Sequence, residues 1–510
     1  MAGDNYTRKS AKNALVSLIS QIFTMLLNFI SRSVFIHCLS AEYLGVNGLF
    51  SNVLTLLSFA ELGIGGALVY AMYRPMKEKN KEKLGQLLSF YRKAYYGIAL
   101  TVICIGFILS FFIEYLVAEQ PKIKENMQSI FWMFLLNNAL SYLLAYKQSL
   151  LMVDQKEYIV SIVRQIVLLV QICAQIALLY LTHEYFVYLI CQLSGTLMVN
   201  VLLLAYVNKH YSWVTKNHIN GSLDKDEKKK IFIDIKALSI SKIAGVVSNG
   251  TDNLIIARLD GLLSVGIVSN YTMITNLVQN LIWNTLSGIT GSIGNFNVDS
   301  SKETKREVFN ELFLLSFWIY GFVSACLVAL LNPFITVWLG EDFAVGLDIV
   351  IALVAILYIS GINFPYYTFR VTSGLFDSVK YNYVLFAVLN VVLSIILGLR
   401  CGLVGVYVAT SISRLMTVEL KEGKVVFEQV LGLNYIDYIK QYLGFFLLVI
   451  LASATALLLS NLITLNGWLG LIAKGAICVV SINAIFWIAF HNTNEYKKIL
   501  ERIVLLISSR

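Results

Sequence analysis

The fold is decided by an apolar run that passes directly into a basic connection, as in the stretch Ser58–Lys83, which reads SFAELGIGGALVYAMYRPMKEKNKEK. The apolar part holds a single charge, Glu61, whereas the connection is rich in lysine and arginine. An α-helix needs about 20 predominantly apolar residues to cross a bilayer, and flanking lysine and arginine mark the cytoplasmic side. The stretch therefore predicts a spanning helix that ends inside the cell.

The composition extends this prediction to all 510 residues of the chain. Hydrophobic residues make up 57% and charged residues 14%, and the mean hydropathy is +0.71, well above that of a soluble domain of ordinary composition. Long apolar runs with only four prolines favour helices over the short alternating strands of a barrel. We expect an all-α integral membrane protein.

Neither the cysteines nor the net charge indicates another class of protein. The seven cysteines show no metal-type spacing, so no metal or cofactor is expected. The formal net charge of +9 lies mostly in short connections between apolar runs, which membrane topology explains better than nucleic-acid binding. Motifs of soluble enzymes, such as phosphate-binding loops and zinc-protease helices, are missing, and the expected outer connections are short for a membrane-bound enzyme.

The apolar runs predict about fourteen spans. Six precede the lysine-rich loop NKHYSWVTKNHINGSLDKDEKKK, six follow it, and two close the chain. Lysine and arginine alternate as the positive-inside rule requires when both termini are cytoplasmic, and Arg370 and Arg414 fall in inner segments. The runs are 14–38, 44–73, 95–117, 127–150, 159–182, 186–207, 238–259, 262–294, 308–332, 347–369, 381–399, 402–418, 439–462 and 467–491.

The two sets of six spans contain an internal repeat. LLSF follows a basic loop at Leu87–Phe90 and again at Leu314–Phe317, and further pairs align at a nearly constant offset. Because six is even, both halves have one orientation, and we expect two pseudo-symmetric six-helix lobes around a central site. The expected parts are an N-terminal lobe (1–207), a cytoplasmic linker (208–237), a C-terminal lobe (238–420), and a helix pair with a cytoplasmic tail (421–510).

Two opposite charges occupy equivalent places in the two halves. SRSVFIHCLS (Ser31–Ser40) aligns without a gap with TDNLIIARLD (Thr251–Asp260), which places Arg32 opposite Asp252. At about 1.5 Å per residue, both lie roughly 10 Å inside the outer boundary. A charge within a span costs about 2.5–3.5 kcal/mol, so both should face protein or water. We hypothesise an ion pair that forms when the outer side closes, with Glu61 or Asp252 exchanging a proton; a purely structural pair is the alternative.

Other polar residues of the spans are candidates for substrate binding or gating. Glu61 lies near mid-membrane beside glycines, which suits either a carboxylate that exchanges a proton or one that only bonds a neighbouring helix. Cations near inner helix ends would attract phosphate if they face a cavity, and would otherwise be interfacial anchors. Amides along the lumen could bind substrate or hold helices together. These candidates are Arg164, Lys242, Asn28, Asn249 and Arg258, of which Arg258 lies nearest an outer helix end.

Two segments carry a resemblance to a known family. SRSVFIHCLSAEYLGVNGLFSNVLTLLSFAELGIGGALVYAMY and TDNLIIARLDGLLSVGIVSNYTMI resemble the openings of the two halves of Wzx-type polysaccharide-biosynthesis flippases. The resemblance covers most of residues 10–420, whereas the last two spans are generic. One departure is an aromatic residue, usual just after the Gly-Ile of the second half, that is displaced here to Tyr271.

The resemblance implies the fold of the multidrug/oligosaccharidyl-lipid/polysaccharide (MOP) exporter superfamily in a bacterial cytoplasmic (inner) membrane. Its implied substrate is an undecaprenyl-pyrophosphate-linked oligosaccharide repeat unit for surface polysaccharide such as O-antigen lipopolysaccharide or capsule. Coupling to a proton or sodium gradient, and work beside a polysaccharide polymerase and glycosyltransferases, are also expected. The alternatives are a drug or cation antiporter of the same superfamily, a peptidoglycan-precursor flippase, and a membrane-bound glycan polymerase or ligase.

Overall fold

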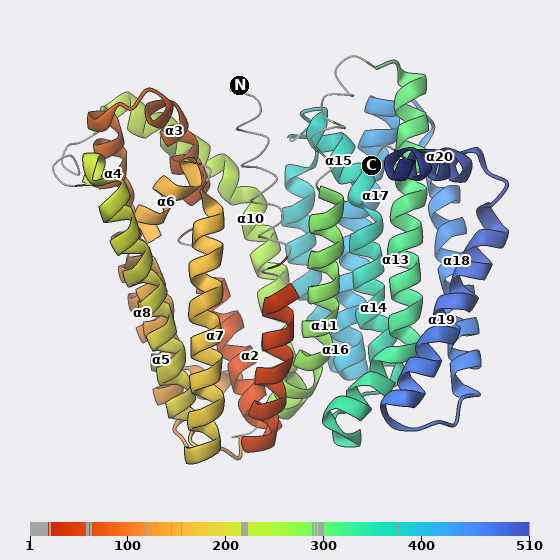
Figure 1. Ribbon diagram of the computed structural model, residues 1–510, viewed down its shortest axis with the longest axis horizontal. Helices are drawn as coiled ribbons and strands as arrows, with labels where there is room; N and C mark the ends of the chain where they lie inside the picture. The colour runs from red at the N-terminus through yellow and green to blue at the C-terminus, as the bar shows by residue number, and fades with distance from the viewer. Residues whose placement is uncertain are drawn as a thin grey trace. The chain divides into compact units, whose positions relative to one another are not determined.

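The computed structural model describes residue 19 and residues 22–508, except 58–60, 62–63, 118–120, 144, 155, 216–222, 288–289, 291–292, 294–299 and 376. All regular structure among these residues is helical (Figure 1). Nine of the described helices are long and apolar enough to cross a membrane. A tenth span results if α5 (Met127–Leu143) and α6 (Ala145–Val153), bent by 46°, count as one. The prediction of an all-α, multi-span membrane protein is therefore confirmed.

The chain divides into two compact units, Met1–Gly266 and Ile267–Arg510. In unit 1, α7 packs along α8, α8 along α5, and α5 along α4, while α10 lies against α2 and α3. The helices of this unit are Ile22–Cys38, α2 (Ala41–Leu57), α3 (Ile64–Lys77), α4 (Lys81–Ser110), η2 (Ile113–Leu116), α5, α6, α7 (Glu157–Thr182), α8 (Tyr185–His210), α9 (Ser212–Thr215) and α10 (Lys225–Leu259).

The long helix α10 begins inside the lysine-rich loop. Asp224 and Glu227 form a capping box, in which each side chain bonds the backbone N–H at the other position. Such a box satisfies two of the free N–H groups of a helix start and fixes where the helix begins. The segment expected as a linker (208–237) therefore contains the first turns of α10.

Unit 2 is built around α13 (Lys302–Leu339), which packs against α14 (Leu347–Ile362), α18 (Tyr435–Asn461) and α19 (Gly467–Phe490). Phe309, Phe313 and Phe317 recur every four residues, so they share one face of α13. All three are fully buried, and the ring centroids of Phe317 and Phe445 are 4.3 Å apart. The other elements are α11 (Gly261–Ser287), which starts in unit 1, η3 (Glu341–Phe343), α15 (Phe364–Thr372), η4 (Asp377–Val379), α16 (Lys380–Arg414), η5 (Leu415–Glu419), α17 (Leu420–Val425), η6 (Val426–Leu431) and α20 (Asn494–Ser508).

The element α16 is a hairpin of two helices rather than one straight rod. Gly402 interrupts it with φ 59° and ψ −140°, a conformation that glycine adopts far more readily than other residues. A Cβ on Gly405 would lie 2.1 Å from the carbonyl oxygen of Leu397, although eight residues of straight helix would separate the two by about 12 Å. The chain therefore reverses at Gly402, between the runs 381–399 and 402–418.

Candidate functional site

Unit 1 contains a polar cavity with a volume of about 520 Å³. Helix Ile22–Cys38 and the helices α5, α6, α7 and α8 line it, together with Glu61. Among the described residues, its wall carries one acidic side chain, Glu61, and one basic side chain, Arg164, among amides and hydroxyls. The size falls within the usual range of roughly 300–1,000 Å³ for small-molecule sites. Two of the sequence candidates, Glu61 and Arg164, thus meet at one cavity.

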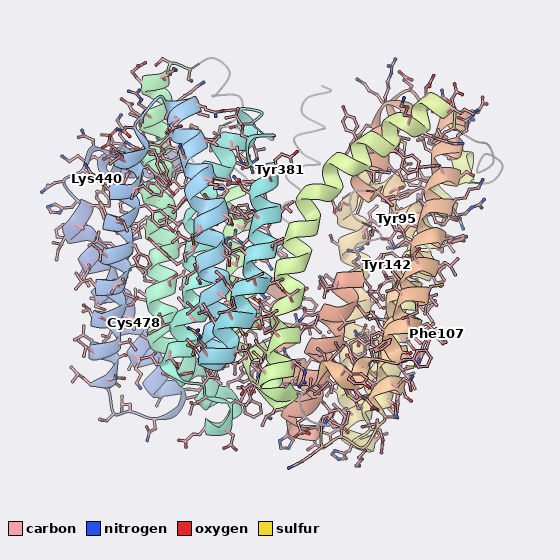
Figure 2. The ribbon with its side chains drawn as sticks, turned by 180° about the vertical axis from the view of Figure 1, so that it is seen from behind. Tyr95, Phe107, Tyr142, Tyr381, Lys440 and Cys478 are labelled. Carbon is pink, nitrogen blue, oxygen red and sulfur yellow. The ribbon has the colours of Figure 1, made fainter. Side chains whose placement is uncertain are left out.

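Glu61 stands at the end of a short chain of tyrosine hydroxyls from α4. Tyr95 donates to Glu61 Oε1 over 2.9 Å, and Tyr91 donates to the Tyr95 oxygen over 3.2 Å. A Cβ on Gly65 would lie only 3.2 Å from the Tyr95 hydroxyl, so the absence of a side chain at Gly65 lets the two helices approach. Tyr142 of α5 packs beside Tyr95, with ring centroids 6.1 Å apart (Figure 2).

Arg164 belongs to a second hydrogen-bonded group on the cavity wall. Its Nη2 donates to Gln148 Oε1 over 3.4 Å, and Gln148 Nε2 donates to Asn200 Oδ1 over 3.3 Å. Asn200 Nδ2 in turn donates to the carbonyl oxygen of Leu140 over 3.0 Å. Gln148 and Asn200 are buried, whereas Arg164 is exposed. The buried amides therefore orient a guanidinium that remains accessible, and a guanidinium binds carboxylate and phosphate oxygens well.

The remaining amides bring α7 against its neighbours. Gln165 Nε2 donates to Thr24 Oγ1 over 2.8 Å. Gln171 of α7 packs closely on Gly195 of α8, where an added Cβ would lie 2.0 Å from Gln171 Oε1. Amide groups both donate and accept hydrogen bonds, as sugar hydroxyls do. This wall can therefore bind a ligand with uncharged hydroxyl groups and one anionic end.

The hypothesised gate residues also lie in unit 1. Arg32, on helix Ile22–Cys38, is close enough to Tyr188 of α8 for an electrostatic interaction, and the neighbouring Phe35 ring lies 5.0 Å from that of Tyr188. Asp252 is partly buried on α10. The ion pair between Arg32 and Asp252 stays a prediction.

Of the four remaining candidates, two have side chains within the described part of the structure. Asn28 is partly buried on helix Ile22–Cys38, and Arg258 is exposed in the last turn of α10, a place that also suits an interfacial anchor. The side chains of Lys242 and Asn249 lie outside the described part of the structure. The roles assigned to these four residues stay predictions.

Sequence reasoning missed most of the cavity wall and a second polar cluster. In α7 the signal was a stripe of polar residues, since Arg164, Gln171 and Gln175 recur at helical spacing in an apolar run. In unit 2, Arg370 and Arg414, assigned to topology alone, form ion pairs with Glu422 and Glu419. The positions of these glutamates relative to the arginines in the sequence did not predict the ion pairs.

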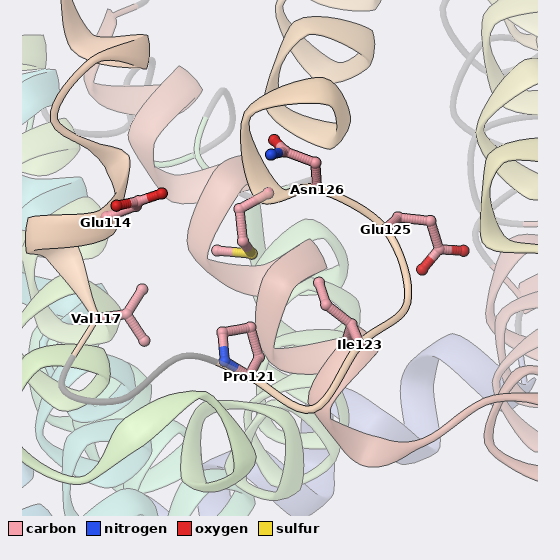
Figure 3. Close-up of a pocket in the computed structure, with 7 residues that line it drawn as sticks. Glu114, Val117, Pro121, Ile123, Glu125 and Asn126 are labelled. Atoms are coloured by element: carbon pink, nitrogen blue, oxygen red, sulfur yellow. The ribbon is translucent and has the colours of Figure 1, made fainter.

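A smaller pocket of about 160 Å³ lies between η2 and the start of α5 (Figure 3). Two of its polar residues, Asn126 and Glu125, are engaged in local structure. Asn126 Oδ1 accepts from the backbone N–H of Gln128 over 2.8 Å and thereby caps α5. Glu125 points away from the pocket and accepts a hydrogen bond from Tyr43. We therefore place the functional site in the larger cavity.

Comparison with known proteins gives a consistent assignment. A family model described as polysaccharide biosynthesis protein matches residues 10–290. The solved structure of the lipid II flippase MurJ in an inward closed conformation is similar, with a TM-score of 0.63 and 18% identity over 94% of this chain and 100% of that chain. An inward-facing multidrug resistance MATE family transporter of the MOP superfamily has a TM-score of 0.58 and 14% identity over 81% of this chain and 98% of that chain.

No curated protein matches the chain in sequence. The structural similarity to these proteins shows that the chain has a MurJ- and MATE-like fold. Because the sequence identities are low, the similarity shows the fold alone. These structural neighbours are a flippase and a transporter. Because the family model spans more than half of the 510 residues, the chain belongs to the polysaccharide biosynthesis protein family.

Proposed function

We propose that this protein is a flippase that moves undecaprenyl-pyrophosphate-linked oligosaccharide repeat units across the bacterial cytoplasmic membrane for surface polysaccharide synthesis. The observation that carries the proposal is the polar cavity of unit 1 in a chain of this family. Its amides and hydroxyls suit sugar hydroxyls, and Arg164 suits the pyrophosphate. The expected partners are the polymerase and glycosyltransferases of the same polysaccharide.

The proposed mechanism is alternating access. It retains about fourteen spans in two pseudo-symmetric lobes, with both termini in the cytoplasm. Arg32 and Asp252 pair when the outer side is closed and separate when it opens. Glu61 couples the cycle to an ion gradient by exchanging a proton, for which the hydroxyls of Tyr95 and Tyr91 offer a hydrogen-bonded chain; sodium is the alternative ion.

Exchanging the charges of Arg32 and Asp252 should restore part of the transport lost in either single variant, whereas no rescue would argue against a direct pair.

A cation antiporter is the second candidate function, favoured by Glu61 as an acidic group in the cavity and by the fold shared with MATE transporters. A peptidoglycan-precursor flippase is a third, because the fold is also that of MurJ. The three candidate functions predict different phenotypes when the protein is lost. Repeat-unit export predicts missing surface glycan, an antiporter predicts drug sensitivity with normal glycan, and a precursor flippase predicts loss of the cell wall.

A deletion strain complemented with single variants tests the proposal. Wild type and Arg164→Lys should restore surface glycan fully or in part, whereas Arg164→Ala should not, because the described wall of the cavity then has no cation. Arg74→Ala is the matched control, since the Arg74 side chain is 88% exposed and pairs only with Glu78 one turn away among the described residues. Normal surface glycan in the deletion strain would contradict the proposal.

A further inference from the structure

A buried cluster of two arginines and two glutamates lies in unit 2. Glu422 of α17 is completely buried, and both of its oxygens have partners. Arg370 Nε lies 3.2 Å from Oε1, and Tyr383 donates to the same oxygen over 2.7 Å. Asn363 Nδ2 donates to Oε2 over 3.0 Å. This carboxylate ties α17 to α15 and α16.

Glu419, three residues earlier, is bound on one side only. Arg414 Nε donates to its Oε1 over 2.7 Å, and the residue is 1% exposed. Within the described part of the chain, its Oε2 has no hydrogen-bond partner. Most buried polar atoms in folded proteins are hydrogen-bonded, so an exception requires an explanation.

The backbone at this place is irregular as well. Glu419 ends the π-helical turn η5, and a second π-helical turn, η6, follows α17. Such turns are rare within α-helices and occur frequently at functional sites. The segment that carries both glutamates thus departs from regular helix on both sides.

The charged and titratable groups around Glu419 come from every neighbouring element. Arg414 and Tyr383 belong to α16, and Glu422 belongs to α17. Helix α18 contributes Tyr438 and Tyr442, and α14 contributes Tyr358 beside Tyr442. Arg370 of α15 reaches the group through Glu422.

We propose that Glu419 is a proton-binding site of unit 2. A proton taken up from water attaches to Oε2 and turns an unpartnered acceptor into an O–H donor, while Oε1 still accepts from Arg414. No other bond changes, and the proton returns to water on release. The cluster is neutral while Glu419 is ionised, because two arginines balance two glutamates, and it carries one positive charge after proton uptake. Protonation thereby weakens the attraction between Arg414 and η5 and alters how this segment packs.

Infrared difference spectroscopy of the full-length protein in lipid, with the buffer pH stepped and no substrate present, tests this proposal. In steps above about pH 6, where carboxyl groups of ordinary pKa are already ionised, wild type should show a carboxylic-acid carbonyl band that disappears reversibly as the acid loses its proton. Glu419→Gln should lose this component. Glu428→Gln should keep it, because Glu428 is an exposed glutamate of η6 whose carboxylate lies 3.9 Å from Lys424.

A band of unchanged intensity in Glu419→Gln would overturn the proposal, as would a wild-type spectrum without a titrating carboxylic acid. If Glu419→Gln does not fold, Glu419→Asp keeps an ionisable group and should shift the titration midpoint of the band; an unshifted midpoint counts against Glu419. Because no substrate is present, a negative result leaves the proposed function untouched.

Discussion

Among single residues, Glu61 carries the sharpest functional expectation, since it is the acidic group of the cavity in unit 1. Glu61→Gln keeps an oxygen that can accept from Tyr95 but can no longer carry a negative charge. We expect folding to be retained and transport to fall at least about tenfold, equivalent to about 1.4 kcal/mol. Transport of the variant at equal protein level measures this, with Glu114→Gln at the smaller pocket as the control. Equal transport by Glu61→Gln and wild type would remove Glu61 from the mechanism.

A variant of Tyr95 tests whether the hydrogen bond to Glu61 contributes to the stability of unit 1. Tyr95→Phe removes the hydroxyl that donates to Glu61 Oε1 and should lower the free energy of unfolding by about 1–2 kcal/mol, because a partly buried hydrogen bond to a carboxylate is lost. Thermal unfolding in detergent measures the change. Tyr115→Phe, at a side chain that is 76% exposed, should leave the unfolding temperature unchanged. Equal unfolding temperatures for both variants would show that the tyrosine chain does not stabilise the unit.

The charges of the site could be found from the sequence, but most of its polar wall could not. Glu61 and Arg164 are conspicuous because a charge within an apolar run is costly and requires a reason. Gln165 is an ordinary helix residue until it meets Thr24, which lies 141 positions away. Asn200 and Gln148 likewise become a pair only through packing of α6 and α8. Such contacts depend on the tertiary fold, about which helical periodicity carries no information.

At the scale of elements, the hairpin in α16 depends on Gly402. Its φ of 59° is strained for any residue with a Cβ, although no atom lies within 4 Å of where that Cβ would be. Gly402→Ala should therefore destabilise the protein by about 1–3 kcal/mol through the backbone alone. Gly444→Ala, in regular helix α18 and equally free of neighbours, should be neutral or stabilising by up to about 1 kcal/mol. Thermal unfolding of the two variants gives the comparison, and equal effects would refute the backbone argument.

Helix α20 crosses the end of α13 (Figure 1) and is held there by two ion pairs of unequal burial. Arg502 Nε lies 2.9 Å from the buried carboxylate of Glu311, whereas Lys498 pairs with the exposed Glu307 over 2.7 Å. Arg502→Ala leaves a buried charge without its partner and should cost about 1–2 kcal/mol. Lys498→Ala should have little effect, since exposed pairs contribute little. Protease sensitivity of the C-terminal helix, together with thermal unfolding, ranks the two variants; the reverse order would contradict the assigned burial.

The pH dependence of the exposed pair has a defined sign. The Glu307 carboxylate raises the pKa of Lys498, so the contribution of this pair is fully present below the ordinary lysine pKa. It is lost only as the pH rises through the higher pKa of the folded state. The order of Arg502→Ala and Lys498→Ala should therefore be the same at every pH near neutrality. A change of order within that range, measured by thermal unfolding, would contradict this assignment.

At the scale of the whole molecule, the apolar runs predicted the class of fold because spanning helices obey one strong rule, the length needed to cross a bilayer. The reversal at Gly402 lies between the runs 381–399 and 402–418, which the sequence pattern had already separated. Arg370 and Arg414 show where such rules reach a limit. The positive-inside rule counts both as topological charges, whereas each pairs with a glutamate inside unit 2.

Reconstituted transport tests the central claim most directly. Proteoliposomes are loaded with an undecaprenyl-pyrophosphate-linked oligosaccharide, and a glycosidase added outside cleaves the molecules that reach the outer leaflet. Wild type and Arg74→Ala should expose the oligosaccharide much faster than protein-free vesicles, and Arg164→Ala and Glu61→Gln should do so at least about tenfold more slowly than wild type. Exposure at the protein-free rate in wild-type vesicles, with the protein folded and correctly inserted, would contradict the assignment as a lipid-linked oligosaccharide flippase.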